Sequence, residues 1–297
     1  MTTHAVAVIG AGPAGIATAI QLLRSGVRPL HLDGGDPGGL LWDAHRVENY
    51  PGFPSGIAGP RLARRFLRHL RAVGGEVRAE RVETLSFEAG FRLTTAEGAQ
   101  NAETVVIATG TRPRPFDSIE IPAEALGLVH RHVWPLRRMR GRRVAVVGAG
   151  DAAYDYALHL ARRNDVTLLN RGTVTRCLPL LEERAAACPR IRTIAGCRLS
   201  SVARHDRRLR LDIDGDAGPR RLDADALVIA IGREPELSLL SANVGRKRDE
   251  LMASGRLHLI GDVANGLYRQ TSIAVGDGVR AAMEICGRLH GRHDANR

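Results

Sequence analysis

Lysine and aromatic residues are scarce in this 297-residue chain. Lys247 is the only lysine among 43 basic residues, so arginine carries almost all of the formal net charge of +11. A basic surface attracts polyanions, but aromatic residues make up only 4% of the chain and offer little for nucleic-acid bases to stack on. We attribute most of the charge to a compositional bias toward arginine and expect no nucleic-acid partner. An anionic cofactor or an acidic protein partner remains compatible with it.

Long hydrophobic runs are absent as well. No run of eighteen or more apolar residues occurs, whereas a membrane-spanning helix needs about 20. The first apolar stretch, residues 5–9, is short and leads straight into a glycine-rich loop, unlike the core of a signal peptide. We therefore expect a cytoplasmic protein with neither a membrane span nor a leader.

Cysteine occurs only four times, at widely and irregularly spaced positions. These are Cys177, Cys188, Cys197 and Cys286. No two of them form a CxxC redox pair, and their spacing does not match paired zinc ligands. We expect reduced thiols, as is usual in the cytoplasm, and no metal site.

The length and the 44% hydrophobic content favour two domains, and one local pattern occurs twice. In the first copy, a short apolar strand begins at Ala5 and leads to a glycine loop at residues 10–15. An amphipathic helix follows to about Ser25, and a second strand ends at Asp33.

The second copy follows the same order. A strand from Arg143 leads to a glycine loop at residues 148–153, a helix runs to about Arg163, and a strand at residues 166–169 ends beside Asn170. Two such units predict an α/β fold with two Rossmann-like nucleotide-binding domains. Each domain is expected to have three layers in the order β, β, α.

Each copy closes with an apolar strand that stops at a glycine before a proline-containing stretch. These strands are residues 105–110 and 227–232. The tail after the second strand has no nucleotide motif of its own, so we expect it to complete the first domain. The predicted boundaries are 1–113 and 236–297 for the first domain, with 114–235 inserted as the second.

The glycines of the first loop point to a dinucleotide. Gly10, Gly12 and Gly15 permit a tight turn and close approach of the backbone to a pyrophosphate, which then sits at the positive N-terminus of the following helix. Asp33 lies eighteen residues after Gly15, where a carboxylate can accept hydrogen bonds from a ribose diol.

The second loop differs in two respects. Ala153 stands where the first loop has its third glycine, and the second strand ends at Asn170 and Arg171, with Arg176 close behind and no carboxylate. An acidic residue would repel a 2′-phosphate, whereas arginines favour it. This favours NADPH over NADH, although the same arginines also suit a solvated loop in an arginine-rich protein.

Six segments together resemble the low-molecular-weight thioredoxin reductases and their relatives in the pyridine-nucleotide disulfide oxidoreductase family. They are GAGPAG at 10–15, GGLLWDAHRVENYPGFPSGI at 38–57, IATG at 107–110, GAGDAA at 148–153, IAIG at 229–232 and IGDVANGLYRQ at 260–270. The resemblance implies a homodimer whose first domain binds FAD and whose inserted domain binds NAD(P)H.

The resemblance also implies which residues contact the cofactors. Asp262 would hydrogen-bond the ribityl chain, Arg269 and Gln270 would lie near the flavin, and the next helix would point its N-terminus at the flavin ring. The full expected set is Gly10, Gly12, Ala14, Gly15, Asp33, Gly39, Leu40, Asn49, Ala108, Gly110, Gly148, Gly150, Asp151, Ala152, Arg171, Arg176, Gly232, Gly261, Asp262, Arg269, Gln270 and Thr271.

The chain departs from the family pattern at three places. The family's GGQL is Gly-Gly-Leu-Leu at 38–41, so Leu40 replaces a polar amide, and one arginine of the phosphate-binding loop is missing. The nearer cysteine of the family's CxxC lies fourteen residues before the second glycine loop. That position is Trp134, so Arg131-His132-Val133-Trp134 replaces the dithiol.

These departures lead to one favoured function and three alternatives. We expect NAD(P)H, FAD and an acceptor or substrate to exchange electrons without a protein dithiol, in either direction. His130, His132 and Trp134 are the candidate catalytic residues, because a histidine can move protons near neutral pH and tryptophan can stack on a flavin or substrate. The histidines also suit a loop without a chemical role.

Two of the alternatives are enzymes with different electron acceptors, and the third is a protein that transfers no electrons. One is a ferredoxin- or flavodoxin-NADP reductase, because a basic surface suits an acidic electron carrier. Another is a tailoring oxidoreductase that acts on a small sulfur-containing or carrier-bound metabolite. The third is a binding or regulatory protein that keeps the nucleotides without turnover.

Overall fold

The computed structural model describes residues 3–216 and 218–291 and falls into two compact units. Unit 1 comprises Met1–Trp42, Val47–Arg112 and Glu234–Arg297, and unit 2 comprises Asp43–Arg46 and Pro113–Arg233. The short segment Asp43–Arg46 therefore groups with unit 2, although its neighbours in sequence belong to unit 1. No sequence pattern predicted this assignment.

A six-stranded sheet forms the centre of unit 1. Its strands are β1 (Thr3–Ile9), β2 (Leu30–Leu32), β3 (Thr84–Phe87), β4 (Phe91–Thr95), β5 (Gly98–Ile107) and β16 (Leu257–Leu259). The order is β2-β1-β5-β4-β3, and β16 pairs with the end of β5. Strands β1, β2, β5 and β16 run parallel, whereas β3 and β4 form an antiparallel extension.

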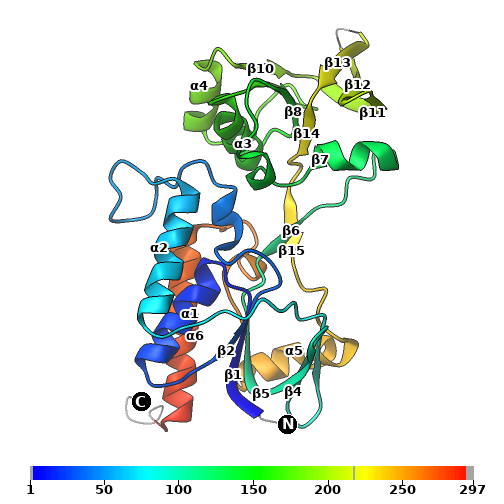
Figure 1. Ribbon diagram of the computed structural model, residues 1–297. Coiled ribbons are helices and arrows are strands. Elements are labelled where there is room, and N and C mark those ends of the chain that lie inside the picture. The colour runs from blue at the N-terminus through cyan, green and yellow to red at the C-terminus, as the bar shows by residue number, and fades with distance from the viewer. Residues whose placement is uncertain (1–2, 217, 292–297) are drawn as a thin grey trace. The chain divides into compact units, whose positions relative to one another are not determined.

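Alternate residues of β1 face two different layers. Val6 and Val8 pack with helices α1 (Pro13–Arg24) and α6 (Thr271–Leu289). Ala7 and Ile9 pack on the opposite face with helix α5 (Ala242–Ala253). Helix α2 (Gly59–Ala72) covers α1, and Figure 1 shows α1, α2 and α6 together on one side of the sheet. Both faces are buried, as parallel strands require.

Helices α1 and α6 approach each other closely at Gly278. A Cβ atom at this position would overlap the carbonyl oxygen of Ala14 and lie 3.0 Å from the backbone nitrogen of Thr18. The lack of a side chain at Gly278 therefore lets α6, from the end of the chain, pack on the helix of the first glycine loop.

Unit 2 repeats the plan with a parallel sheet of its own. Its strands are β7 (Val129–His130), β8 (Arg143–Val147), β9 (Asp165–Leu169), β10 (Ile191–Ile194) and β14 (Ala226–Ile229), in the order β10-β9-β8-β14-β7. Helices α3 (Asp151–Ala161) and α4 (Pro179–Ala186) cover one face. An antiparallel sheet of β11 (Cys197–His205), β12 (Arg208–Gly215) and β13 (Arg220–Ala224) covers the other.

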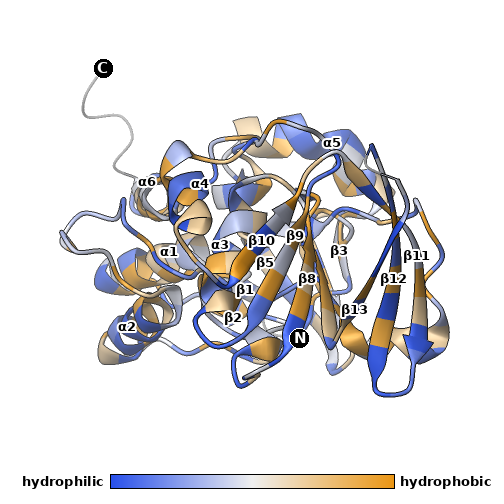
Figure 2. Cartoon of the chain, turned by 90° about the horizontal axis from the view of Figure 1, so that it is seen from above, coloured by the Kyte–Doolittle hydropathy of each residue, from blue (hydrophilic) through white to orange (hydrophobic). Residues whose placement is uncertain are grey.

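Strand β12 shows why this second sheet forms a layer. Polar and apolar residues alternate along it, and Leu209, Leu211 and Ile213 are buried against the parallel sheet. Figure 2 shows the resulting alternation of blue and orange along β12. The sheet thus has one solvent-exposed face and one buried face, as is typical of antiparallel sheets.

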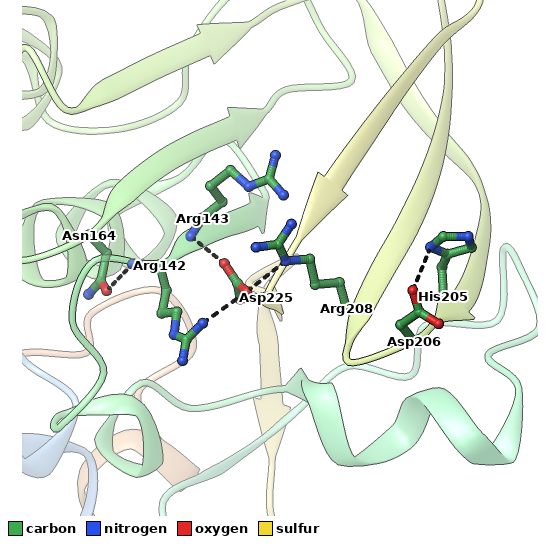
Figure 3. Close-up of polar contacts among 7 residues, drawn as sticks. All are labelled: Arg142, Arg143, Asn164, His205, Asp206, Arg208 and Asp225. Atoms are coloured by element: carbon green, nitrogen blue, oxygen red, sulfur yellow. Dashed lines mark hydrogen bonds and ion pairs between the residues drawn. The ribbon is translucent and has the colours of Figure 1, made fainter.

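One carboxylate ties the amino ends of three strands of unit 2 together. Asp225 precedes β14, and its side chain is only 11% exposed. It accepts hydrogen bonds from the backbone nitrogen of Arg143 at 2.8 Å and from Nε of Arg208 at 3.3 Å, and it pairs with Arg142 at 3.6 Å (Figure 3). The second glycine loop directly follows β8 and so lies at the opposite, carboxyl edge of the sheet.

The two crossings between the units pair with one another. Strands β6 (Thr111–Pro113) and β15 (Arg233–Pro235) form a two-stranded sheet. The predicted α/β fold with two Rossmann-like ββα units is confirmed. Within the described residues, no helix has the length and apolar character needed to cross a membrane.

Candidate functional site

The three glycines of the first loop have different roles in the structure. Gly10 has φ +103°, and a Cβ there would overlap the carbonyl oxygen of Ala108. A Cβ at Gly15 would overlap the carbonyl oxygen of Gly10. A Cβ at Gly12 would meet nothing within 4 Å. Packing therefore requires two of the glycines, while the third borders open space at the start of α1.

This space suits a pyrophosphate. Helix α1 begins after Gly12 without a side-chain cap and without an acidic residue in its first turn, so its N–H groups and dipole favour an anion. The backbone nitrogen of Gly38 donates to the carbonyl oxygen of Ala11 at 2.7 Å. This contact brings the loop of Gly39 and Leu40 to the same place, and a Cβ at Gly39 would lie 3.2 Å from Cα of Gly12.

Asp33 lies beside the first glycine loop, as the sequence predicts. Its Oδ2 accepts from the backbone nitrogen of Ala11 at 2.5 Å, and its Oδ1 accepts from that of Gly35 at 2.7 Å. A carboxylate has about four lone-pair sites, so Asp33 can hold the loop and still accept from a ribose hydroxyl.

His31 was missed by sequence reasoning. It is 3% exposed, and its Nε2 lies 3.0 Å from the carbonyl oxygen of Gly10. Burial lowers the pKa of His31, against the opposing effects of the Gly10 hydrogen bond and of Asp33. The neutral imidazole of His31 thus stabilises the glycine loop through its hydrogen bond to Gly10.

Gly261, from the other end of the chain, lies against the start of α1. Gly261 has φ +70°, and a Cβ there would lie 2.9 Å from that of Ala14. Its backbone nitrogen donates to Oδ2 of Asp277 at 3.1 Å, and Nδ2 of Asn265 donates to the same oxygen at 2.6 Å. Asp277, which the sequence did not single out, therefore fixes the turn that carries Asp262.

The structure brings Asn49 and Gln270 together across 221 residues. Nδ2 of Asn49 donates to Oε1 of Gln270 at 2.8 Å, and Oγ of Ser272 donates to the carbonyl oxygen of Asn49 at 3.4 Å. Helix α6 begins at Thr271 without a side-chain cap or an acidic residue in its first turn. Its N-terminus is thus suited to the electron-rich end of a reduced flavin. Arg269 directly precedes Gln270 in the sequence and is half-buried.

The second glycine loop repeats the division of roles. Gly148 has φ +149°, and a Cβ there would overlap the carbonyl oxygen of Ala230. A Cβ at Gly150 would meet nothing within 4 Å. The backbone nitrogen of Arg176 donates to the carbonyl oxygen of Ala149 at 2.8 Å, which places Arg176 directly beside the open position.

The loop after β9 holds its shape through Asn170. This residue is 2% exposed, its Oδ1 accepts from the backbone nitrogen of Gly172 at 3.0 Å, and its Nδ2 donates to the carbonyl oxygen of Val174 at 3.3 Å. Arg171 and Arg176 are exposed, and neither side chain has an ion-pair partner within residues 3–216 and 218–291. Asn170 is thus structural, and the two guanidinium groups face solvent.

The remaining predicted contact residues border these loops. Asp151 and Ala152 form the first turn of α3, and Oδ1 of Asp151 accepts from the backbone nitrogen of Leu178 at 2.7 Å. Gly110 and Gly232 follow β5 and β14 and have φ values of +67° and +112°. All of these cofactor assignments stay predictions.

Asp43 organises residues 132–134, part of the segment that the resemblance aligns with the family's CxxC. Its Oδ1 accepts from the backbone nitrogens of Val133 and Trp134 at 2.9 Å each. Its Oδ2 lies 2.6 Å from Nδ1 of His132. Asp43 is 4% exposed, whereas the His132 side chain is 39% exposed. Sequence reasoning named His132 and Trp134 but missed Asp43.

The other two candidate catalytic side chains have different surroundings. His130 ends β7, is half-buried, and has its pKa lowered by desolvation. Trp134 has the guanidinium of Arg137 over its ring, at 4.5 Å from the ring centroid, which is a cation–π contact.

A second layer of titratable groups lies around Asp43. Burial, followed by the charge of Asp43, raises the pKa of Tyr156. Burial and the charge of Arg162 lower the pKa of His159, whose ring packs edge to face on that of His45 at 5.7 Å. Tyr156 and His159 are thus held in their neutral forms near neutral pH.

The four thiols are free and do not resemble a redox pair. Cys197 is buried and donates to the carbonyl oxygen of Ile194 at 3.0 Å. Burial raises the pKa of Cys197 and of Cys177, and Glu182 and Asp151 add to the effect at Cys177. Since the thiolate is the reactive form, these two cysteines are poor nucleophiles. No group of three or more metal-ligating side chains is found within residues 3–216 and 218–291.

Known proteins resemble this chain over nearly its whole length. The family model for pyridine nucleotide-disulphide oxidoreductases matches residues 4–278. A bifunctional thioredoxin reductase/thioredoxin of Mycobacterium leprae (strain TN) is 34% identical over 95% of this chain, which spans 65% of that protein. The thioredoxin reductase of Mycolicibacterium smegmatis is 29% identical, with 95% of this chain and 96% of that protein covered.

Solved structures give the same picture. Lactococcus lactis thioredoxin reductase in its FR conformation matches with a TM-score of 0.85 at 26% identity, covering 97% of this chain and 99% of that one. The T. acidophilum thioredoxin reductase, at 22% identity and a TM-score of 0.84, shares the fold. The chain therefore belongs to the pyridine nucleotide-disulphide oxidoreductase family and is an FAD-dependent NAD(P)H oxidoreductase, with FAD and NADPH as the cofactors that this family uses.

Proposed function

We propose that this enzyme transfers electrons between NADPH, FAD and an acceptor without a protein dithiol in between. The observation that carries the proposal is the arrangement at residues 131–134, where the buried Asp43 carboxylate binds the His132 ring and the backbone of Trp134. Arg131 and Trp134 stand at the two positions that the resemblance assigns to the cysteines of CxxC. The four thiols lie in other parts of the chain, and the pKa values of Cys177 and Cys197 are raised.

The residues of the chain supply binding and orientation. FAD, when bound, supplies the hydride chemistry. The open space at Gly12 and the uncapped start of α1 suit its pyrophosphate, Asp33 its ribose, and the start of α6 its flavin. Exposed Arg171 and Arg176 suit a 2′-phosphate. We also propose that the enzyme is a homodimer and is located in the cytoplasm.

Anaerobic reduction of the purified protein by NADPH tests this function. The flavin is expected to bleach on reduction and to be reoxidised by ferricyanide or a quinone. Serine at all four cysteine positions should leave both half-reactions intact. A flavin that NADPH cannot reduce would instead indicate a binding or regulatory protein, and loss of turnover through one cysteine replacement with FAD retained would restore a thiol mechanism.

The preference for NADPH has its own test at the exposed arginines. Each charge-assisted hydrogen bond is worth about 1.5–3 kcal/mol. Replacing both Arg171 and Arg176 with alanine should therefore reduce the preference for NADPH over NADH by at least roughly tenfold in KM. An equal change for both nucleotides would show that this loop does not contact the 2′-phosphate.

A second candidate is a reductase for an acidic electron-carrier protein such as a ferredoxin or flavodoxin. Helix α2 favours it, because its solvent face carries exposed arginines and the helix has no acidic residue. These arginines are Arg61, Arg64, Arg65, Arg68 and Arg71. Ferredoxin-supported reduction of cytochrome c would distinguish this candidate from a tailoring oxidoreductase that acts on a small sulfur-containing or carrier-bound metabolite.

A further inference from the structure

Three segments that we propose to contact FAD come from both ends of the chain, and α6 holds them together. They are the start of α1, the turn at residues 261–265 and the start of α6 itself. Figure 1 shows α1 and α6 side by side, and two consecutive residues of α6 make close contacts with the other two segments. Gly278 contacts α1, and Asp277 contacts the turn.

The contact at Gly278 brings the backbones of α1 and α6 together directly. A Cβ atom on Gly278 would overlap the carbonyl oxygen of Ala14 and lie 3.0 Å from the backbone nitrogen of Thr18. Thr18 is fully buried, and its hydroxyl donates to the carbonyl oxygen of Ala14 at 2.9 Å. The first turn of α1, which follows the open position at Gly12, is therefore packed against the middle of α6.

Asp277 holds both ends of the turn that contains Asp262. Its Oδ2 accepts from the backbone nitrogen of Gly261 at 3.1 Å and from Nδ2 of Asn265 at 2.6 Å. Backbone bonds also close the turn, because the nitrogens of Ala264 and Asn265 donate to the carbonyl oxygen of Gly261 at 2.9 and 3.2 Å. The Asp277 side chain is only 13% exposed, and a buried carboxylate oxygen needs such donors.

We infer that Asp277 is a positioning residue for FAD. It fixes the turn at residues 261–265 against α6, and Gly278 lets α1 pack on the same helix, so groups from both ends of the chain are in place before the cofactor binds. Asp277 acts through Gly261 and Asn265 and not by touching FAD. A site that is ordered in advance binds its ligand more tightly, because less conformational freedom is lost on binding. The inference rests on the proposed function in one respect, the placement of FAD at the first glycine loop.

Asp277→Asn and Asp277→Ala test this role. The asparagine amide oxygen can still accept from Gly261 and Asn265, whereas alanine leaves both donors without this acceptor. The dissociation constant of FAD can be measured by adding FAD to the cofactor-free, full-length protein and following flavin fluorescence. It should stay within about twofold of the parent for Asp277→Asn and rise at least about tenfold for Asp277→Ala, which loses two hydrogen bonds.

Two further variants serve as control and as second test. Arg280→Ala removes the remaining partner of Asp277, whose guanidinium lies 3.2 Å from Oδ1 at a 71% exposed position. Exposed ion pairs contribute little, so this variant should bind FAD as the parent does. Asn265→Ala removes one of the two donors and should raise the dissociation constant about threefold to tenfold. It keeps the inference testable if Asp277→Ala does not fold.

Hydrogen exchange of the cofactor-free protein gives a readout that does not depend on the flavin. The amide hydrogens of Gly261, Ala264 and Asn265 should exchange at least about tenfold faster in Asp277→Ala than in the parent, because the turn opens more often. Those of Asp277→Asn should match the parent. The amide hydrogens of β1 and β5 should remain protected in every variant, which would show that the sheet of unit 1 is intact.

The outcomes separate the inference from the placement of FAD on which it rests. A folded Asp277→Ala variant with the FAD affinity of the parent, or an Asp277→Asn variant as weak as Asp277→Ala, would overturn the positioning role. Gly12→Val tests the placement itself, because nothing lies within 4 Å of the added Cβ and the side chain would fill the proposed pyrophosphate site. A Gly12→Val variant that binds FAD as tightly as the parent would overturn the proposed placement, whatever the Asp277 variants do.

Discussion

At the scale of single residues, the two glycine loops separate packing from binding. Gly10 and Gly148 lie against backbone oxygens, whereas Gly12 and Gly150 face open space. The sequence motif gives these glycines equal weight, because it records only that a side chain is absent. The structure shows which absence serves the fold and which leaves room for a ligand.

A matched pair of variants tests this separation in unit 2. Gly150→Val should leave the thermal midpoint and the FAD content near those of the parent, because nothing lies within 4 Å of the added Cβ. It should raise KM for NADPH by at least about tenfold, because the side chain would occupy the phosphate site. Gly148→Val should instead destabilise the fold by about 1–3 kcal/mol or more, since it overlaps Ala230 and has φ +149°. The opposite pattern would show that Gly150 does not border the nucleotide.

His31 should make stability depend on pH. Burial lowers its pKa in the folded protein, whereas the unfolded chain has a value near 6.5. As the pH falls below about 6.5, the unfolded state therefore takes up the proton first, and stability declines until the pH passes the lowered folded pKa. His31→Gln keeps a donor for Gly10 but removes this titration.

The thermal midpoint measured between pH 7.5 and pH 5.5 checks this expectation. The parent should lose stability over this range more steeply than His31→Gln. His130, His159 and His258 also have lowered pKa values, so the slope of the variant should be reduced and not abolished. Equal slopes in the parent and the variant would show that His31 is not the source.

Residues also differ in how far the sequence could reveal them. Asp33, Gly12 and Gly150 belong to local motifs, so their positions in the loops could be predicted. Asp43 could not, because its partners lie 89 to 91 residues away and its own neighbours carry no pattern. Asp277 was missed for the same reason, since its contacts with Gly261 and Asn265 depend on how α6 packs.

At the scale of elements, helix α2 combines a buried apolar face with a basic outer face. Leu62, Ala63 and Leu70 are buried, while the five arginines from Arg61 to Arg71 are exposed. None of these five arginines forms an ion pair with the described residues. The apolar face packs on α1, so the outer face presents its arginines to solvent.

Charge reversal on α2 tests whether an acidic carrier protein binds there. Electrostatic steering raises association rates by about 10–10³-fold and weakens with salt. Arg64→Glu with Arg68→Glu should slow electron transfer to ferredoxin several-fold at low ionic strength, with little difference at about 0.5 M salt. Arg246→Glu with Arg248→Glu on α5 makes the same change of charge at exposed positions and should have a smaller effect. Equal effects of the two pairs would point to net charge alone.

Elements differ in predictability as residues do. The helix that the sequence analysis expects directly after Arg269 and Gln270 is α6, which begins at Thr271. The covering sheet of β11, β12 and β13 was not assigned in advance. Its alternation indicates strands facing water on one side, but only nonlocal packing decides that they cover the parallel sheet of unit 2.

At the scale of the whole molecule, the repeated unit explains why the overall organisation could be predicted. Each copy brings its own strand, glycine loop and helix, so each specifies one nucleotide-binding unit from local sequence alone. What the chain does with the electrons depends instead on residues 131–134, which we propose stand in place of the dithiol. Asp43, which binds these residues, belongs to the segment Asp43–Arg46, which the sequence places in one unit and the contacts place in the other.

The electron capacity of the molecule gives the last prediction. FAD accepts two electrons, and an active dithiol would accept two more. If Arg131 to Trp134 take the place of CxxC, as we propose, anaerobic titration with NADPH should stop at one equivalent per flavin. The raised pKa values of Cys177 and Cys197 make these thiols poor substitutes for the dithiol. The variant with serine at all four cysteines should give the same endpoint, whereas Trp134→Ala should change the flavin spectrum or slow reoxidation. An endpoint of two equivalents that falls to one in the serine variant would identify a working disulfide and exclude direct transfer from flavin to acceptor.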